Sequence, residues 1–292
     1  MAYTPKQRTF RKRETKEEFA ARKKAEKEAA YESIDAAISE MMQSEESFKD
    51  YLAFQSRMER YTVSNTLLIM SQRPDATQLK SADSWNELGA TINKGEKGIH
   101  ILEPHDFVDD EGNQRTSYNI KNVFDIAQTN AEPLPAKTFD RSPKALVKAM
   151  LNATPINKAA VDELPIENST AYFDDKSKTL MVKKHSDTVS MFKDISRELS
   201  LAEIAANSDE YNRTECLPSA VCASYMLCEK YGIDNSDINV ESSKAMWKGK
   251  ENKNVRIMLT MANDSLYSLS KDIYVEMNKA KDKESKTQEQ TR

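Results

Sequence analysis

The chain has 292 residues, of which 31% are charged and 38% are hydrophobic, and its formal net charge is −4. No apolar run approaches the roughly 20 residues that a membrane-spanning helix needs, so the sequence excludes a transmembrane protein. The acidic balance argues against a protein that coats duplex nucleic acid over its whole surface. Because the basic N-terminus has no apolar stretch behind its charges, it is unlike a secretory signal peptide, and we expect a cytoplasmic protein.

Residues 1–30 are predicted to form a charged N-terminal arm and helix. Residues 1–16 carry one acid, Glu14, against six basic side chains: Lys6, Arg8, Arg11, Lys12, Arg13 and Lys16. Such an arm either contacts phosphates or stays solvated. A helix is expected from Lys16 to about residue 44, because Ile34, Ile38 and Met41 recur at the spacing of one helical face.

Residues 31–135 are predicted to form a first domain, in which helices precede a small sheet. A second helical pattern has apolar or aromatic side chains at Phe48, Tyr51, Leu52 and Met58. A third, with an apolar cluster at residues 67–70, ends before Pro74. Alternation at Ile99 and Ile101 predicts a strand closed by Pro104, and an acidic turn separates it from another strand at residues 118–129.

Prolines mark residues 136–145 as a linker to a second domain, residues 146–280. A hairpin is expected around the polar turn at residues 174–178, followed by a helix at residues 187–206. A further helix from Pro218 ends before Gly232, and a long helix covers residues 254–279. Residues 281–292 read as a disordered tail. The fold class is therefore α+β with two domains.

The three cysteines lie six residues apart in one apolar stretch, at Cys216, Cys222 and Cys228. This spacing fits neither a zinc site nor a disulfide framework, so we expect buried thiols. With three histidines in the chain, sites built from several imidazoles are disfavoured.

The first domain offers side chains suited to a single nucleic-acid strand, which needs cations for phosphates and aromatic faces for bases. Candidate stacking platforms are Tyr61, Trp85 and Tyr118, and candidate phosphate contacts are Arg57, Arg60, Arg73, Lys94, Lys97 and Lys121. Lys94 and Lys97 flank Gly95 in a turn whose backbone N–H groups add anion contacts. The alternative is that the aromatic side chains pack in a core and that the lysines are a solvated turn.

Three segments of this domain carry a resemblance: YTVSNTLLIMSQRPDAT, SWNELGATINKGEKGIHILEP and VFDIAQT. In this order they resemble the N-terminal single-stranded-DNA-binding module of ArdC-like proteins of plasmids, conjugative elements and phages. The resemblance implies single-stranded DNA as the partner and a role in antirestriction.

The second domain resembles the zinc-peptidase domain that follows this module in ArdC-like proteins. That frame has H-E-x-x-H on one helix and a glutamate ligand on the next. Here the two His positions are Arg197 and Leu201 and the downstream ligand position is Val221, so only the general-base position, Glu198, is kept. None of the three replacements can donate a lone pair to zinc, so we expect no metal, no cofactor and no peptidase activity.

An alternative metal site built from His185, Asp194 and Glu203 is disfavoured, because Glu203 lies on a different part of the helix from Glu198. Two alternatives to DNA binding stay open. The first alternative is a protein-interaction module that engages a host defence or phage protein. The second is a zinc peptidase with unusual ligands.

Overall fold

The structure is a computed structural model that describes residues 14–132 and 140–290, with the side chains of residues 280–290 left out. The N-terminal half contains α1 (Lys16–Met41), α2 (Glu45–Arg57), α3 (Val63–Gln72), β1 (Leu79–Lys80), α4 (Ala82–Glu87), β2 (Ile99–Val108), β3 (Gln114–Asp125) and the 3-10 helix η1 (Ile126–Gln128). The C-terminal half contains α5 (Pro143–Ala153), β4 (Asn157–Val161), β5 (Ala171–Asp174), β6 (Thr179–Lys183), α6 (Thr188–Ala206), α7 (Arg213–Tyr231), α8 (Val240–Trp247) and α9 (Asn252–Gln290). The mixture of helices with two small sheets confirms the predicted α+β class.

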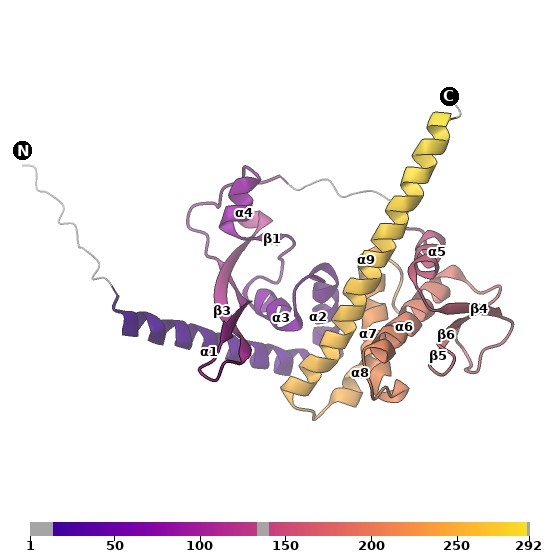
Figure 1. The fold of residues 1–292 in the computed structure, drawn as a ribbon, viewed down its shortest axis with the longest axis horizontal. Coiled ribbons are helices and arrows are strands. Elements are labelled where there is room, and N and C mark those ends of the chain that lie inside the picture. The colour runs from indigo at the N-terminus through magenta and orange to yellow at the C-terminus, as the bar shows by residue number, and fades with distance from the viewer. Residues whose placement is uncertain (1–13, 133–139, 291–292) are drawn as a thin grey trace, which may run out of the picture.

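Polar caps define where the N-terminal helices begin. Thr15 and Glu18 form a capping box at the start of α1, in which each side chain accepts the backbone N–H of the other residue. The N-terminal end of α1 projects from the body of the molecule (Figure 1). The C-terminal half of the helix packs into the core, where Ala30, Ile34, Ile38 and Met41 are buried. The predicted periodicity of this helix is thus confirmed.

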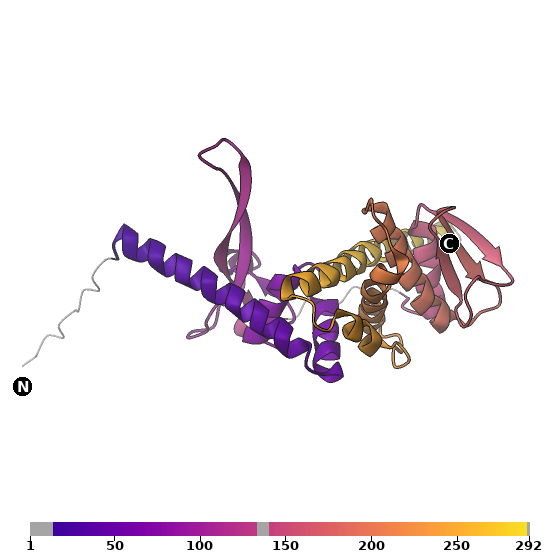
Figure 2. The same cartoon turned by 90° about the horizontal axis from the view of Figure 1, so that it is seen from below.

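The first sheet has the order β1-β3-β2 and is antiparallel throughout. Strands β2 and β3 form a long hairpin whose base packs into the core through Ile99, Ile101 and Val123, while the part toward its tip projects from the molecule (Figure 2). The prediction that Pro104 closes the first strand is wrong, because β2 continues to Val108. As an edge strand, β2 points alternate N–H groups away from its single partner, so proline is tolerated there.

The second sheet has the order β4-β6-β5, with β4 parallel to β6 and β5 antiparallel to it. The predicted hairpin is β5–β6, and the first predicted helix is α6, capped by Asp187. The second is α7, which ends before Gly232, at a left-handed φ of 71°, as predicted, but begins at Arg213, so Pro218 lies inside the helix and does not start it. The helix α5 and the strand β4 were not predicted.

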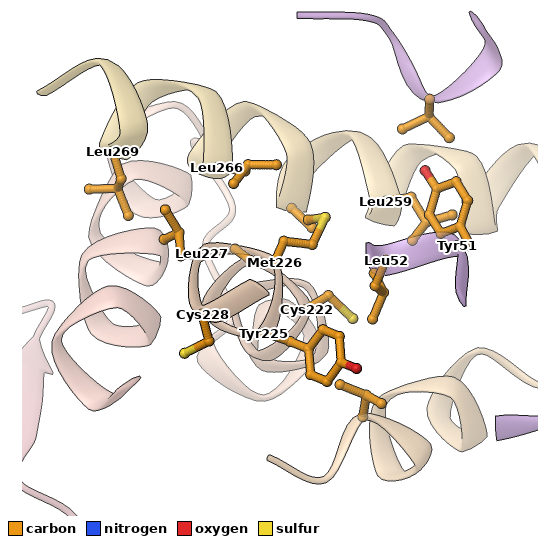
Figure 3. Packing of buried hydrophobic residues seen from close by; sticks show 14 of the residues in the cluster. Tyr51, Leu52, Cys222, Tyr225, Met226, Leu227, Cys228, Leu259, Leu266 and Leu269 are labelled. Carbon is orange, nitrogen blue, oxygen red and sulfur yellow. The ribbon is translucent and has the colours of Figure 1, made fainter. Parts of the chain in front are cut away.

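A shared helical core joins the two halves. Figure 3 shows α7 passing through it, with Cys222, Met226 and Leu227 packed between Leu52 of α2 and Leu266 of α9. All three cysteines are buried and free, as predicted, and burial raises the pKa of the Cys228 thiol to about 12. The two sheets lie at opposite ends of the molecule (Figure 1), so each predicted domain keeps its own sheet while the helices between them form one core.

Two boundary predictions need correction. Of the predicted linker, residues 136–139 lie outside the described residues, but Pro143 is already the first residue of α5, with Ser142 as its cap. The predicted disordered tail is helical as far as Gln290, because its Lys, Glu and Gln residues favour helix and continue α9. The basic residues of the predicted arm before Glu14 also lie outside the described residues. No helix in the described part of the chain is long and apolar enough to cross a membrane.

Candidate nucleic-acid interface

A groove of about 680 Å³ lies between the two halves of the molecule. One wall is the C-terminal end of α2 and the turn after it, and the other wall is the end of α7 with the middle of α9. Its lining residues are Ala53, Ser56, Arg57, Glu59, Arg60, Arg141, Glu229, Lys230, Tyr231, Tyr267, Ser270, Lys271 and Tyr274.

The groove is positively charged. Five cations line it, Arg57, Arg60, Arg141, Lys230 and Lys271, against two carboxylates, Glu59 and Glu229, which leaves an excess of three positive charges. Lys230 lies 2.8 Å from Glu59 across the junction of the halves, so this pair neutralises itself. Arg60 and Lys271 are exposed, in positions open to an anionic ligand.

Aromatic faces accompany these charges. Tyr267 and Tyr274 are 44% and 39% exposed, although large aromatic side chains usually bury most of their surface. Both lie on α9, with Lys271 between them at i+4 from Tyr267, so one face of the helix presents ring, cation and ring to the groove. Phosphate-binding cations beside exposed rings are what a single nucleic-acid strand requires.

Buried amide hydrogen bonds hold the two walls together. The side chain of Gln55, on α2, donates its Nε2 to Oδ1 of Asn263 on α9 at 2.8 Å, and Asn263 donates its Nδ2 to the carbonyl of Tyr61 at 3.2 Å. Both amide side chains are almost fully buried. The spacing between the cations of α2 and the tyrosines of α9 is therefore set by the core.

Two of the nine predicted nucleic-acid-binding residues, Arg57 and Arg60, line this groove. Arg60 is exposed there, but the guanidinium of Arg57 donates to the carbonyls of Pro74, at 2.7 Å, and Ala76, at 3.2 Å. It also lies 4.4 Å from the ring centroid of Phe54. Arg57 is thus mainly structural.

The prediction that Trp85 is a stacking platform is wrong. Trp85 is 2% exposed, and its Nε1 donates to the carbonyl of Phe124 at 2.9 Å, which fastens α4 to β3. Tyr61 is half-buried, and burial raises the pKa of its hydroxyl. Arg73 is paired with Asp75 at 3.3 Å. Packing or pairing thus occupies each of these three side chains.

The other predicted residues lie away from the groove. Lys94 and Lys97 are exposed in the turn before β2, as predicted, and Gly95 has a φ of 93°. On the hairpin, Tyr118 is 39% exposed and Lys121 is ion-paired with Glu103. The C-terminal half contributes groove residues that were not predicted: Arg141, Lys230, Tyr267, Lys271 and Tyr274. The i, i+4, i+7 spacing of Tyr267, Lys271 and Tyr274 was the signal that one helix face carries them.

The predicted general-base position, Glu198, is sealed inside the C-terminal half. Its carboxylate is fully buried and accepts the backbone N–H of Phe173 at 2.9 Å. Nη2 of Arg213 lies 2.8 Å from each of its oxygens, and Nε of Arg197 lies 3.1 Å from Oε1. Each carboxylate oxygen thus accepts from two donors of the protein itself.

The residues at the predicted ligand positions do not fit a zinc ion. Arg197 is a cation that also pairs with Asp194 at 2.8 Å, Leu201 is buried among apolar side chains and Val221 packs against the core. Among the described residues, no group of three His, Cys, Asp or Glu side chains is arranged to hold a metal. The residues of the alternative metal site do not come together either. Asp194 accepts from the backbone N–H of Thr170, and His185 is exposed.

The protein is thus of the α+β class and has a basic, tyrosine-lined groove between its two halves. Residues 23–132 match the family model of the N-terminal domain of the anti-restriction factor ArdC. An uncharacterized protein of Bacillus anthracis, pXO2-81, is 25% identical over an alignment that covers 82% of this chain and 47% of the relative. The chain therefore spans about half the length of this relative.

Two crystal structures of the antirestriction protein ArdC from plasmid R388 are similar over 73% of this chain and 85% of theirs. The metal-free structure has a TM-score of 0.45 and 17% identity, and the Mn(II)-bound structure has a TM-score of 0.48 and 16% identity. On the family match, residues 23–132 form an ArdC-type N-terminal domain, as the sequence resemblance predicted.

Proposed function

We propose that this protein is a non-catalytic, single-stranded-DNA-binding protein that serves a mobile genetic element in antirestriction, in the cytoplasm of the host. The observation that carries the proposal is the groove in which Arg60 of the ArdC-type domain faces Lys271 and the exposed rings of Tyr267 and Tyr274. The ArdC-type domain at residues 23–132 supports the antirestriction role.

The groove favours a single strand over a duplex for a physical reason. Base faces are available for stacking on tyrosine only when the bases are unpaired and unstacked, and such stacking contributes about 1–3 kcal/mol per base. A duplex offers phosphates to Arg60 and Lys271 but offers no base face to Tyr267. Charge therefore contributes to binding both forms, and the rings discriminate between them.

The non-catalytic part of the proposal is supported by the surroundings of Glu198. A general base must reach the proton that it abstracts, directly or through one water. Glu198 is instead held by Arg213, Arg197 and the N–H of Phe173. Its role is then to bind α6 to β5 and to the start of α7.

The test of the proposal is the affinity of the full chain for a labelled single-stranded oligonucleotide and for the matching duplex, at about 50 and 200 mM salt. We expect tighter binding of the single strand and a steep loss of affinity at the higher salt. Absence of binding at low salt, or equal affinity for both forms, would overturn the proposal.

A second candidate function is that of a protein-interaction module, and the β2–β3 hairpin favours it. Phe107 and Val108, near its tip, are 44% and 63% exposed. The hairpin is also acidic, with Glu103, Asp106, Asp109, Asp110 and Glu111 against Arg115 and Lys121. The partner would be a host defence or phage protein with a basic and apolar surface.

Substitution at the hairpin tip separates this candidate from DNA binding. Removing the whole N-terminal helix is unsuitable, because Ile34 and Ile38 belong to the core. Phe107→Ser with Val108→Ser should abolish cross-linking to a host protein and leave oligonucleotide affinity unchanged. Cross-linking that does not depend on these side chains would remove the hairpin as a docking surface.

A further inference from the structure

A separate pocket, of about 270 Å³, lies in the C-terminal half between α5, α6 and α9. It shares no residue with the groove. Pockets for drug-sized ligands measure about 300–1,000 Å³, so this one has room for a single side chain or a small molecule.

The floor of the pocket is apolar. Met150 of α5, Leu199 of α6 and Leu269 of α9 line it, and all three side chains are buried. At the rim, Pro155 and Ala206 are exposed, so the pocket opens to solvent. A ligand that enters it gains contact with an apolar surface.

Two carboxyl groups also line the pocket, Glu203 of α6 and Asp272 of α9. The carboxyl group of Glu203 is hydrogen-bonded to the side chains of Ser268 and Ser265 on α9, so the neighbouring helix fixes its position. Ser265 is itself 2% exposed, which makes this arrangement part of the packed structure. Of the described residues that line the pocket, none is basic, so the pocket itself supplies no counter-ion.

The charged groups of α9 that face Glu203 are acids. Burial, and to a smaller extent Asp272 and Asp264, raise the pKa of Glu203 to about 7. Lys271 and Lys279 lower the pKa of Asp272, but burial is the larger effect and the net shift is upward. Within the described ranges, no lysine or arginine forms an ion pair with Glu203.

On the side of α5 and β4, the nearest cation is already engaged. Lys158 does not line the pocket, and its Nζ donates to the carbonyls of Leu151, at 2.9 Å, and Thr154, at 3.1 Å. The carboxyl of Glu203 is therefore partly buried without a cationic partner. A positively charged ligand would favour the ionised form of such a group.

We propose that this pocket binds a primary alkylammonium group, whose N–H donors are accepted by the carboxylates of Glu203 and Asp272. The apolar stem of the ligand packs on the floor of the pocket. An ammonium has three donors and no acceptor, which suits a pocket whose polar side chains are two acids and two hydroxyls. A metal ion fits less well, because no three His, Cys, Asp or Glu side chains in the described part of the chain are arranged to hold one.

The same chemistry serves two sources of the ligand, a free aliphatic amine and a lysine side chain of a partner protein. The proposal is independent of DNA binding, because a small amine alone is sufficient to test it.

The experiment follows the methyl signal of Met150 in the full chain labelled with ¹³C at its methionine methyl groups. Met150→Leu assigns the signal. The protein is titrated with n-butylammonium chloride at constant ionic strength and, separately, with n-butanol, which has the same stem without the charge. We expect the Met150 signal to shift and saturate with butylammonium and to respond at least tenfold more weakly to butanol.

The affinity for butylammonium should also depend on pH. Because the pKa of Glu203 is about 7, its carboxylate is mostly protonated at pH 6 and mostly ionised at pH 8. Protonation removes the charge that the ammonium requires, so we expect binding to be about tenfold weaker at pH 6 than at pH 8.

Two variants make the result specific. Glu203→Gln removes the charge but still accepts hydrogen bonds from Ser265 and Ser268, so it should keep the fold and weaken the butylammonium response at least tenfold. The matched control is Glu40→Gln, which removes an exposed carboxylate from a different pocket, between α1, α2 and α3, and should leave the response unchanged. A Met150 signal that does not move with butylammonium, that moves equally with butanol, or that moves equally in the two variants would overturn the proposal.

Two further probes distinguish the sources of the amine. One is 1,4-diaminobutane, and the other is a blocked tripeptide with a central lysine. A stronger response to the peptide than to the diamine assigns the pocket to a lysine of a partner protein, and an equal or weaker one assigns it to the free amine.

Discussion

Nη2 of Arg213 lies 2.8 Å from both carboxylate oxygens of Glu198, and this contact joins the first residue of α7 to the middle of α6. Nη1 of the same guanidinium donates to the carbonyl of Phe173, on β5, at 3.3 Å, and the group lies 4.5 Å from the ring centroid of Tyr172. Arg213 therefore connects two helices and a strand through one buried carboxylate.

Replacing Arg213 by methionine should destabilise the fold, because it removes the larger share of the charge that compensates Glu198. Breaking a buried ion pair costs about 3–5 kcal/mol, and since Arg197 remains beside the carboxylate we expect about 2–4 kcal/mol. Urea unfolding of the variant measures this loss. The control is Lys184→Met, which breaks the exposed pair with Asp162 and should cost about 0–1 kcal/mol. Equal losses in the two variants would contradict the structural role of Glu198.

Zinc should not bind stoichiometrically to the purified chain, because Arg197, Leu201 and Val221 offer no lone pair. Elemental analysis by mass spectrometry checks this. Introducing Arg197→His and Leu201→His together should still give no tight zinc site, since Val221 supplies no third ligand and Arg213 keeps Glu198 occupied. Stoichiometric zinc in the unmodified chain, with a lower Tm after chelation, would favour a peptidase with unusual ligands instead.

Stability should fall as the pH rises between about 5 and 7, because of Glu203. The pKa of Glu203 is raised from 4.5 to about 7, mainly by burial and to a smaller extent by the nearby carboxylates of Asp272 and Asp264. Hydrogen bonds with Ser268 and Ser265 act in the opposite direction and lower this pKa. The folded state then binds a proton that the unfolded state has lost, so stability is greater below this window than above it.

Urea unfolding at pH 5 and pH 8 measures this effect, and Glu203→Gln should remove the larger part of it. Burial also raises the pKa of Asp264 and Asp272, so a smaller slope of the same sign should remain. If Glu203→Gln keeps the full slope, the buried carboxyl is not its source.

Tyr267 should contribute to single-strand affinity and not to stability. Its ring is 44% exposed, so Tyr267→Ala removes a stacking face of about 1–3 kcal/mol per base, a loss of roughly 5–150-fold in affinity. Oligonucleotide titration measures the loss, and duplex affinity should change little. The control is Tyr118→Ala, at a ring of similar exposure on the hairpin, which should leave affinity unchanged. A larger loss of single-strand affinity in Tyr118→Ala than in Tyr267→Ala would indicate that the strand binds at the hairpin and not in the groove.

Much of the fold follows from local sequence signals. The spacing of Ile34, Ile38 and Met41 predicts the buried face of α1, and Gly232 predicts the end of α7. Where the prediction failed, a tertiary relationship decided the outcome: Pro104 lies in β2 because that strand has a single neighbour.

The site was harder to predict than the fold, because it is assembled from distant parts of the chain. Arg60, Lys230 and Lys271 meet only after α2, α7 and α9 have packed together. Residue type also does not distinguish a core ring from an exposed one: Trp85 is buried, whereas Tyr267 and Tyr274 carry the exposed faces. By contrast, Arg197, Leu201 and Val221 are read directly from the sequence, and packing does not change what their side chains lack.

The most direct test of the account compares two charge-reversal variants in single-stranded oligonucleotide binding. Arg60→Glu with Lys271→Glu alters the groove, and Lys94→Glu with Lys97→Glu alters the exposed turn of the ArdC-type domain by the same charge. We predict that the groove variant loses at least tenfold in affinity and that the slope of log affinity against log salt falls by about 1.4, at roughly 0.7 for each phosphate contact. The turn variant should bind as the unmodified chain does. Full affinity in the groove variant, with the loss in the turn variant instead, would contradict the account.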